Sequence, residues 1–232
     1  MEFTFDEYGR LLDSLIEDGY SFTDYERMPS RGQVILRHDV DWSPEKALRM
    51  ARMEADRDVQ STYFFLVTTP FYNVHARDIR ETIAEIEALG HDVGLHFSTH
   101  EYWREEPLES DLLRRINGER RALDSVVDDL TETIAFHIPP EWTLDRSFNG
   151  FVNSYEPRFF SAVTYLGDSG QRWRSGHPFE DGIPERMQLL THPGLWGDED
   201  AAFEKRLEQQ QERRFEAVRG FLASEFLSEG SD

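Results

Sequence analysis

The sequence predicts an α/β protein built around a mainly parallel sheet or barrel. Short apolar runs alternate along the chain with segments whose apolar residues recur at helical spacing. Strands and helices in such alternation are typical of parallel strands joined by crossover helices. No repeat and no long linker rich in Pro, Gly or Ser divides the 232 residues. We therefore expect one domain over residues 1–232.

The first quarter of the chain predicts helix, strand and helix. Residues 5–18 space their apolar side chains at helical intervals, which predicts an amphipathic helix. Residues 32–39 form a compact apolar run that ends in charged residues, as a buried strand does. A helix is expected within 41–56, where Ser43 is suited to cap it and Pro44 to occupy its first turn.

The same alternation continues to the C-terminus. Residues 61–67 predict a second strand, and residues 75–90 predict a helix that Gly90 would end. Further strands are expected over 91–96, 133–137, 162–169 and 186–192, and further helices over 106–129 and 198–227.

The charge of the chain limits its partners. There are 46 acidic and 25 basic side chains, a net charge of −21, and only Lys46 and Lys205 are lysines. Such a negative field repels phosphate backbones, which argues against a nucleic-acid partner. Many acids with few lysines are typical of halophilic proteins in molar cytoplasmic salt, where screening keeps an acidic surface soluble. An ordinary acidic protein that prefers arginine is the alternative.

Targeting signals and cysteines are missing from the sequence. No stretch approaches the roughly 18 apolar residues of a membrane span. The first 20 residues are acidic and amphipathic, unlike a secretory or transit peptide, so we expect a cytoplasmic location. The chain has no cysteine, which excludes disulfides and zinc–thiolate sites. The oligomeric state stays open.

Histidines and carboxylates recur where the predicted strands end. They are His38, Asp39, Asp41, His96, His137, Asp168 and His192. In parallel α/β folds the working residues gather at the carboxyl ends of the strands. Solvated loops would favour acids and serines there, but they do not explain four histidines. The pattern therefore predicts an active site at this edge of the sheet.

The segment "GHDVGLHFSTH" suggests a metal site. His96 and His100 are four residues apart and would share a face if the chain coils after Gly94. A single histidine there would more often be a core residue bonded to a carbonyl group. The pair Asp39 and Asp41 on a neighbouring strand favours an Asp-His-His ligand set with open positions. We expect a divalent cation, zinc first, although cobalt, nickel and iron also suit these ligands.

Five segments together resemble a known family. "VILRHDVD", "GHDVGLHFSTH", "FHIPP", "TYLGDS" and "QLLTH" occur in the order of the motifs of the polysaccharide deacetylases (NodB-homology, carbohydrate esterase family 4). The sequence is most similar to a divergent branch with Arg-His-Asp-Val-Asp. The resemblance covers about residues 33–196. It implies a distorted (β/α) barrel and the deacetylation of a carbohydrate. The first and last predicted helices lie outside the resemblance and are expected as extra N- and C-terminal helices.

The resemblance also implies residue roles. His96 and His100 would bind the metal with one aspartate, and the other aspartate would be the general base. Aligned by column, Asp39 is the base and Asp41 the ligand. His192 would protonate the departing amine, and Asp168 and His137 would orient these groups.

The chain departs from the family pattern at two places. Val40 separates the two aspartates, which leaves the roles of base and ligand interchangeable. His137-Ile138 stands where the family usually has an arginine before two prolines. An imidazole, or another arginine such as Arg37, would then tune the base.

Each tryptophan follows one of the motif positions. They are Trp42, Trp103, Trp142, Trp173 and Trp196. They could be aromatic plugs at the mouth of the barrel, or they could rim a cleft that stacks on sugar rings. We take the second interpretation as the prediction, with a carbohydrate or amino sugar as the substrate.

The sequence thus predicts a metal-dependent hydrolase that removes an N-acetyl group from a sugar or glycan precursor. A hydrolase of the same fold acting on a non-sugar amide is one alternative. A degenerate, non-catalytic carbohydrate-binding domain is the other.

Overall fold

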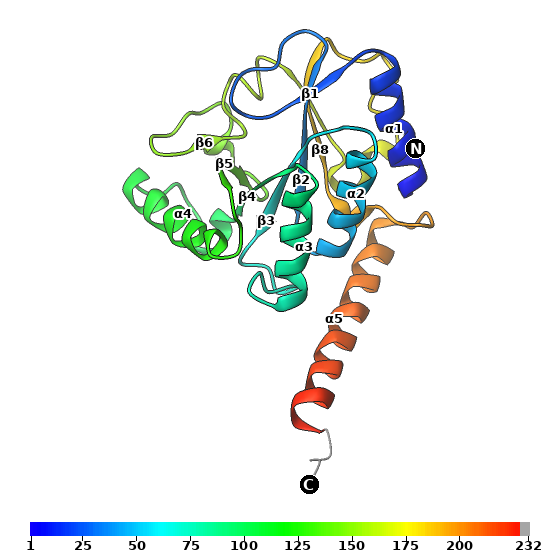
Figure 1. Cartoon of the computed structure of the whole chain (residues 1–232). Coiled ribbons are helices and arrows are strands. Elements are labelled where there is room, and N and C mark those ends of the chain that lie inside the picture. The colour runs from blue at the N-terminus through cyan, green and yellow to red at the C-terminus, as the bar shows by residue number, and fades with distance from the viewer. Residues whose placement is uncertain (228–232) are drawn as a thin grey trace.

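A curled sheet of parallel strands forms the centre of the structure. The computed structural model describes residues 1–227; residues 228–232, which belong to the predicted domain, lie outside the described range. The strands are β1 (Ser21–Thr23), β2 (Gln33–Val40), β3 (Thr62–Leu66), β4 (Asp92–Phe97), β5 (Leu130–Phe136), β6 (Val152–Asn153), β7 (Thr164–Gly167) and β8 (Arg186–Thr191). Their order is β6-β5-β4-β3-β2-β8-β7, with β1 beside the start of β2. The sheet forms a half-barrel (Figure 1), so the predicted fold class is confirmed.

Five helices lie outside the curled sheet in the described chain. They are α1 (Phe5–Glu17), α2 (Pro44–Ala55), α3 (Arg77–Ala88), α4 (Glu109–Asp124) and α5 (Phe203–Phe226). The helices α2 and α3 pack side by side on one face, and α1 lies beside α2. Figure 1 shows α5 leaving the body and extending away from it. Both terminal helices expected from the sequence are therefore present.

The two faces of β2 carry different chemistry because successive side chains of a strand point to opposite sides. Ile35 packs on the inner face with Phe64 of β3 and Phe159. Arg37 and Asp39 follow on this same face. The helices meet the opposite face, where Leu36 packs in a cluster with residues of α1. Period two thus directs the charged pair of β2 into the half-barrel.

His38 faces the helices and is part of a buried network instead of the active site. Its Nε2 lies 2.9 Å from Oε1 of Glu54 in α2, and both side chains are fully buried. Its Nδ1 lies 2.7 Å from the hydroxyl of Thr191, and the hydroxyl of Tyr8 donates to Glu54. This network joins α1, α2, β2 and β8. One of the four histidines at strand ends therefore stabilises the packing of helices on the sheet.

The predicted elements agree with the observed ones except at short or capped segments. The strands β1 and β6 were not expected, because two or three residues give no readable periodicity. Ser43 does occupy the N-cap position of α2, but its side chain makes no capping hydrogen bond. Its hydroxyl donates instead to Oε1 of Gln210 in α5, at 2.9 Å. Within residues 1–227, no helix has the length and apolar character needed to cross a membrane.

Candidate metal centre and active site

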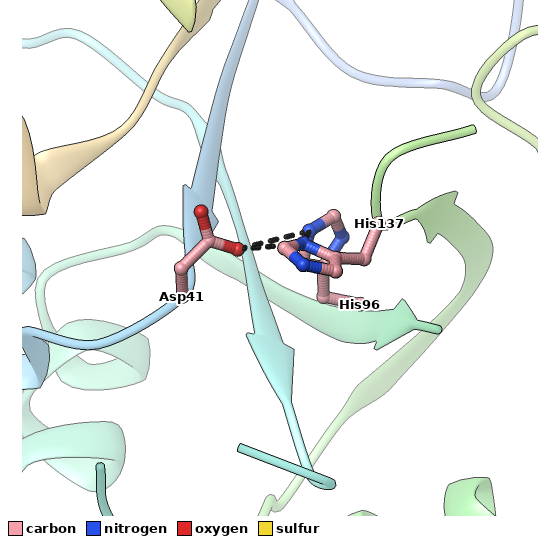
Figure 2. Close-up of side chains that lie close together, drawn as sticks. All are labelled: Asp41, His96 and His137. Atoms are coloured by element: carbon pink, nitrogen blue, oxygen red, sulfur yellow. Dashed lines mark hydrogen bonds and ion pairs between the residues drawn. The ribbon is translucent and has the colours of Figure 1, made fainter. Parts of the chain in front are cut away.

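Three side chains from three strands meet at the carboxyl edge of the sheet. Asp41 follows β2, His96 lies near the end of β4, and His137 follows β5. Asp41 Oδ1 lies 3.0 Å from His137 Nδ1 and 3.3 Å from His96 Nε2. The two ring nitrogens are 3.1 Å apart. Figure 2 shows the carboxylate of Asp41 facing both imidazole rings.

The tautomer of His96 suits metal binding. Its Nδ1 lies 2.9 Å from the carbonyl oxygen of Ala135 in β5, so this nitrogen carries the hydrogen and donates it. The Nε2 atom is then left with a free lone pair that faces Asp41 and His137. Ligating histidines commonly have their second ring nitrogen bonded in this way, which fixes the orientation of the ring.

The distances among these atoms fit one cation. Tetrahedral ligands bound to zinc at about 2.0–2.1 Å lie about 3.3 Å from each other. The three observed separations are 3.0, 3.1 and 3.3 Å. Asp41 Oδ1 is buried and accepts no well-directed hydrogen bond, although two ring nitrogens are close to it. The three atoms point at a common position, as ligands of a cation do.

The electrostatics of Asp41 also suit a cation ligand. Burial by itself would raise the pKa of Asp41, but the neighbouring His137 and His96 outweigh this effect. The pKa of Asp41 is therefore held well below its ordinary value, and the carboxylate is ionised at neutral pH. An ionised carboxylate beside imidazole nitrogens suits Zn²⁺ and similar divalent metals.

The structure places His137, and not His100, beside Asp41 and His96. The chain does not coil after Gly94, because β4 continues to Phe97 and a short 3₁₀ turn begins only at Thr99. His100 is exposed, and its Nε2 lies 2.9 Å from the carbonyl oxygen of Ile138. This placement replaces the expectation that His96 and His100 act as a helical pair.

His137 reaches the site through an unusual backbone turn. Its backbone N–H donates to the carbonyl oxygen of Phe97, which continues the pairing of β5 with β4. Ile138 then has a φ of 44°, a left-handed conformation that is rare for a β-branched residue. The hydrogen bond from His100 to Ile138 supports this turn. His100 thus contacts the segment that carries His137.

Asp39 lies on the same side as Asp41 but is held differently. Both of its oxygens accept hydrogen bonds from Arg37, from Nε at 2.8 Å and from Nη2 at 2.7 Å. Arg37 is fully buried and also donates to Ser154 and Tyr155. Burial would raise the pKa of Asp39, but Arg37 outweighs it and the pKa is lowered. Of the two groups expected beside this carboxylate, an imidazole or Arg37, it is Arg37 that holds both of its oxygens.

His192 and Asp168 form a second charged pair at this edge. His192 follows β8, and its Nδ1 lies 2.6 Å from Oδ1 of Asp168, which follows β7. Asp168 is fully buried and also accepts hydrogen bonds from the backbone N–H of His192 and from Nε1 of Trp196. Burial would lower the pKa of His192, but the charge of Asp168 raises it to about 9. His192 is therefore a cation at neutral pH.

A cavity of about 720 Å³ opens over these groups. Asp39, Asp41, His96, His137 and His192 all line it. Much of the remaining wall is apolar: Trp42, Leu66, Pro70, Phe71, Phe136, Leu144, Tyr155, Phe160, Tyr165, Leu190, Leu195, Phe203 and Leu207. The arrangement places two carboxylates and three imidazoles against an apolar surface that can hold an organic substrate.

Only one of the five tryptophans contacts this cavity among residues 1–227. Trp42 lines it, whereas Trp173 and Trp196 are buried in the core beside α1. Trp103 and Trp142 are partly buried and pack against Phe97 and Phe136. The expected rim of five tryptophans is therefore replaced by other aromatic side chains. Phe71, Tyr155, Phe160, Tyr165 and Phe203 supply it, and of these only Tyr165 lies within a quoted motif, "TYLGDS".

Comparisons with known proteins show similarity only among solved structures. No protein-family model and no curated protein matches the chain. The chitin deacetylase of the fungal pathogen Colletotrichum lindemuthianum is 15% identical, with 81% of this chain and 84% of that chain covered and a TM-score of 0.48. A family 4 carbohydrate esterase pseudoenzyme from Bacillus anthracis is 14% identical, with 85% and 64% covered and a TM-score of 0.49. A family 4 acetyl xylan esterase from Clostridium thermocellum, in complex with a cobalt ion, is 13% identical, with 81% and 83% covered and a TM-score of 0.46.

Proposed function

We propose that this protein is a metal-dependent hydrolase that removes an N-acyl group, acetyl in the first instance, from an amino sugar or glycan precursor. One observation supports this most directly. A ligand set suited to a divalent cation, a carboxylate held by an arginine and a protonated imidazole line one cavity. Amide hydrolysis needs these three functions: an activated water, a proton acceptor and a proton donor.

Asp41, His96 and His137 would hold the cation. A divalent cation at such a site polarises the carbonyl oxygen of an amide and makes water more acidic. The hydrogen bond from His96 to Ala135 keeps the His96 ring oriented toward the cation. The convergence of the three side chains is built by the ends of three strands, so the sheet itself sets their spacing.

Asp39 would accept a proton from the attacking water. Its Oδ2 lies 3.7 Å from His96 Nε2, close to the proposed cation position but outside the ligand group. Arg37 holds both oxygens of the carboxylate in one orientation and keeps the carboxylate ionised. A base that is ionised and fixed beside the cation is ready to take a proton at neutral pH.

His192 would donate a proton to the departing amine. It lines the same cavity and is protonated at neutral pH because Asp168 raises its pKa to about 9. Asp168 also receives the backbone N–H of His192 and the indole of Trp196, which fixes its position. Loss of an amine requires such a proton, since an amide anion is a very poor leaving group.

The order of the sequence motifs supports an acylated sugar as the substrate. A non-sugar amide is the second candidate substrate, because many of the side chains in the cavity wall are apolar. Ionised Asp39 and protonated His192 beside a complete ligand set argue against a degenerate binding domain.

The proposal is tested with a panel of N-acetylated sugars and cyclic amides. Purified protein loaded with zinc or cobalt is assayed for released amine and acetate, with Asp39→Asn as the control. We expect release from at least one acetylated sugar and its loss in the variant. If only the cyclic amides are hydrolysed, the substrate is a non-sugar amide and the acetylated-sugar assignment is wrong. No turnover in the metal-loaded protein would favour the binding domain.

A further inference from the structure

The second half of α5 has a surface that nothing in the described chain covers. Every residue from Gln211 to Leu227 is exposed. Of the eleven large apolar side chains that are exposed within residues 1–227, seven lie on or just after α5: Leu207, Phe215, Val218, Phe221, Leu222, Phe226 and Leu227. Figure 1 shows this part of the helix extending clear of the sheet and of the other helices.

The exposed part of α5 lacks the packing against an apolar surface from which most helical stability in proteins comes. Gly220, in the middle of this segment, lowers its intrinsic helix propensity further. The segment from Gln211 to Leu227 exposes six large apolar side chains, so it would gain stability from an apolar surface that packs against it.

Most of these apolar side chains form one stripe together with the polar Gln211. Gln211, Phe215, Val218 and Leu222 follow one another at spacings of four, three and four residues, which is the pattern of a coiled-coil seam. Phe221 and Phe226 widen the stripe on its two sides. The stripe continues onto the body of the protein, because Phe215 and Val218 line a groove of about 340 Å³ together with Pro70 and Phe71.

We propose that the stripe of α5, defined as Gln211, Phe215, Val218, Leu222 and Phe226, packs against the same stripe of a second copy of this chain, with the two helices antiparallel. The charge of the helix favours this occupant. Residues 203–227 contain five acidic and five basic side chains, so the net charge of −21 belongs to the rest of the chain. This segment is where two copies repel each other least.

The charged residues beside the stripe select the antiparallel arrangement. Glu212 and Arg219 lie on one side of the stripe, seven residues apart, and Arg214 lies on the other side. Antiparallel helices bring equivalent sides together, so Glu212 of each copy meets Arg219 of the other. Parallel helices would bring Arg214 of one copy against Arg219 of the other, and two arginines repel. Opposite charges at such flanking positions set partner choice and orientation.

A lipid surface is the competing occupant of an amphipathic helix, and the charges disfavour it. Helices that lie on membranes commonly have lysine and arginine on the polar face. The exposed residues of α5 include five acidic and four basic side chains, and the whole chain is strongly acidic. An anionic lipid surface would therefore repel the protein.

Sedimentation velocity of the full chain over a concentration series tests the proposal. We expect a dimer whose affinity rises from low salt to molar KCl, because salt screens the repulsion between two acidic bodies. Leu222→Glu should raise the dissociation constant by more than about thirty-fold, the effect of losing an interface hot spot. Ala217→Glu adds the same charge on the opposite face of the helix and should leave the dimer intact.

Charge reversal and cross-linking test the orientation. Glu212→Arg alone should weaken the dimer, and combining it with Arg219→Glu should restore it. Since the chain has no cysteine, Gln211→Cys and Leu222→Cys proteins can be oxidised together. We expect a disulfide between the two different variants and none within either alone.

Three results would overturn the proposal. One is a monomer at every protein and salt concentration. Another is a dimer that Leu222→Glu does not weaken. The third is a monomer that binds phosphatidylcholine vesicles through the stripe, which would assign the surface to lipid.

Discussion

Nδ1 of His192 lies 2.6 Å from Oδ1 of Asp168, a fully buried carboxylate. Asp168 accepts from the backbone N–H of His192 as well, so one carboxylate fixes both the ring and the strand end that carries it. Trp196 donates to the second oxygen of Asp168. These contacts hold the His192 ring in one orientation, and the raised pKa of His192 can be tested by titration.

The pH dependence of activity should follow His192. Its pKa of about 9 keeps the imidazolium protonated at neutral pH, so the proposed acid should be lost above about pH 9. We expect kcat/KM to fall above that pH. In Asp168→Asn the charge that raises the pKa of His192 is removed, and the falling limb should move to lower pH, toward the ordinary histidine value of about 6.5. The pH–rate profile of both proteins and NMR titration of the His192 ring measure this.

The contribution of His192 to the free energy of unfolding should also fall as the pH rises. The folded protein raises the pKa of His192 above its unfolded value of about 6.5, so the folded state binds the proton more tightly. This contribution is fully present below about pH 6.5 and is lost as the pH rises through about 9. Urea unfolding at several pH values compares the protein with His192→Gln. An equal pH dependence in the two proteins would contradict the raised pKa.

Arg37 should be more important for stability than a surface arginine. It is fully buried and donates two hydrogen bonds to Asp39. Arg37→Met leaves the Asp39 carboxylate buried without a counter-charge, so we expect a loss of about 3–5 kcal/mol of unfolding free energy. Adding Asp39→Asn removes that charge and should recover part of the loss. Urea denaturation of the two single variants and the double variant measures the coupling.

Asp39→Asn should separate proton transfer from metal binding. Asparagine keeps the shape of the side chain but cannot accept the proton, so we expect turnover to fall by about 10²–10⁴-fold. The metal content should stay unchanged, because Asp39 is outside the group formed by Asp41, His96 and His137. Elemental analysis and a turnover assay on the same sample check this. If the variant lost its metal, the roles of Asp39 and Asp41 would be exchanged.

The thermal stability of the protein should rise steeply with salt. At a net charge of −21 the folded chain repels itself, and the Debye length falls from about 10 Å at 0.1 M to about 3 Å at 1 M. We expect the melting temperature to increase over this range of KCl concentration. The interpretation as a halophilic protein would be contradicted by a melting temperature that does not change.

The strands and the positions of their polar ends could be predicted from the sequence. Apolar runs mark β2, β4 and β8, and the period of two along β2 predicts that Asp39 and Asp41 face the same centre, which the distances to His96 confirm. Arg37 was identified as a candidate partner of the base for a different reason, because His137-Ile138 stands where the resembled family usually has an arginine. These features depend on local periodicity, which a sequence shows directly.

The source of the second imidazole could not be predicted in this way. Its position depends on how far β4 extends before the chain turns, and on the left-handed backbone at Ile138. Neither property is visible in the spacing of His96 and His100. The tryptophans were misleading for a related reason: Trp196 follows a strand end, yet its ring turns into the core and donates to Asp168. Sequence adjacency to a site does not give the direction of a side chain.

The metal content of matched histidine variants tests the central claim most directly. His137→Ala and His100→Ala proteins are prepared in parallel, dialysed against zinc or cobalt, and measured by elemental analysis with circular dichroism as the control for folding. We expect His137→Ala to lose the metal, because its Nδ1 lies 3.1 Å from Nε2 of His96. His100→Ala should keep the metal, since His100 is exposed and bonded to a carbonyl oxygen. Stoichiometric metal in His137→Ala, with loss in His100→Ala, would contradict the site described by Asp41, His96 and His137.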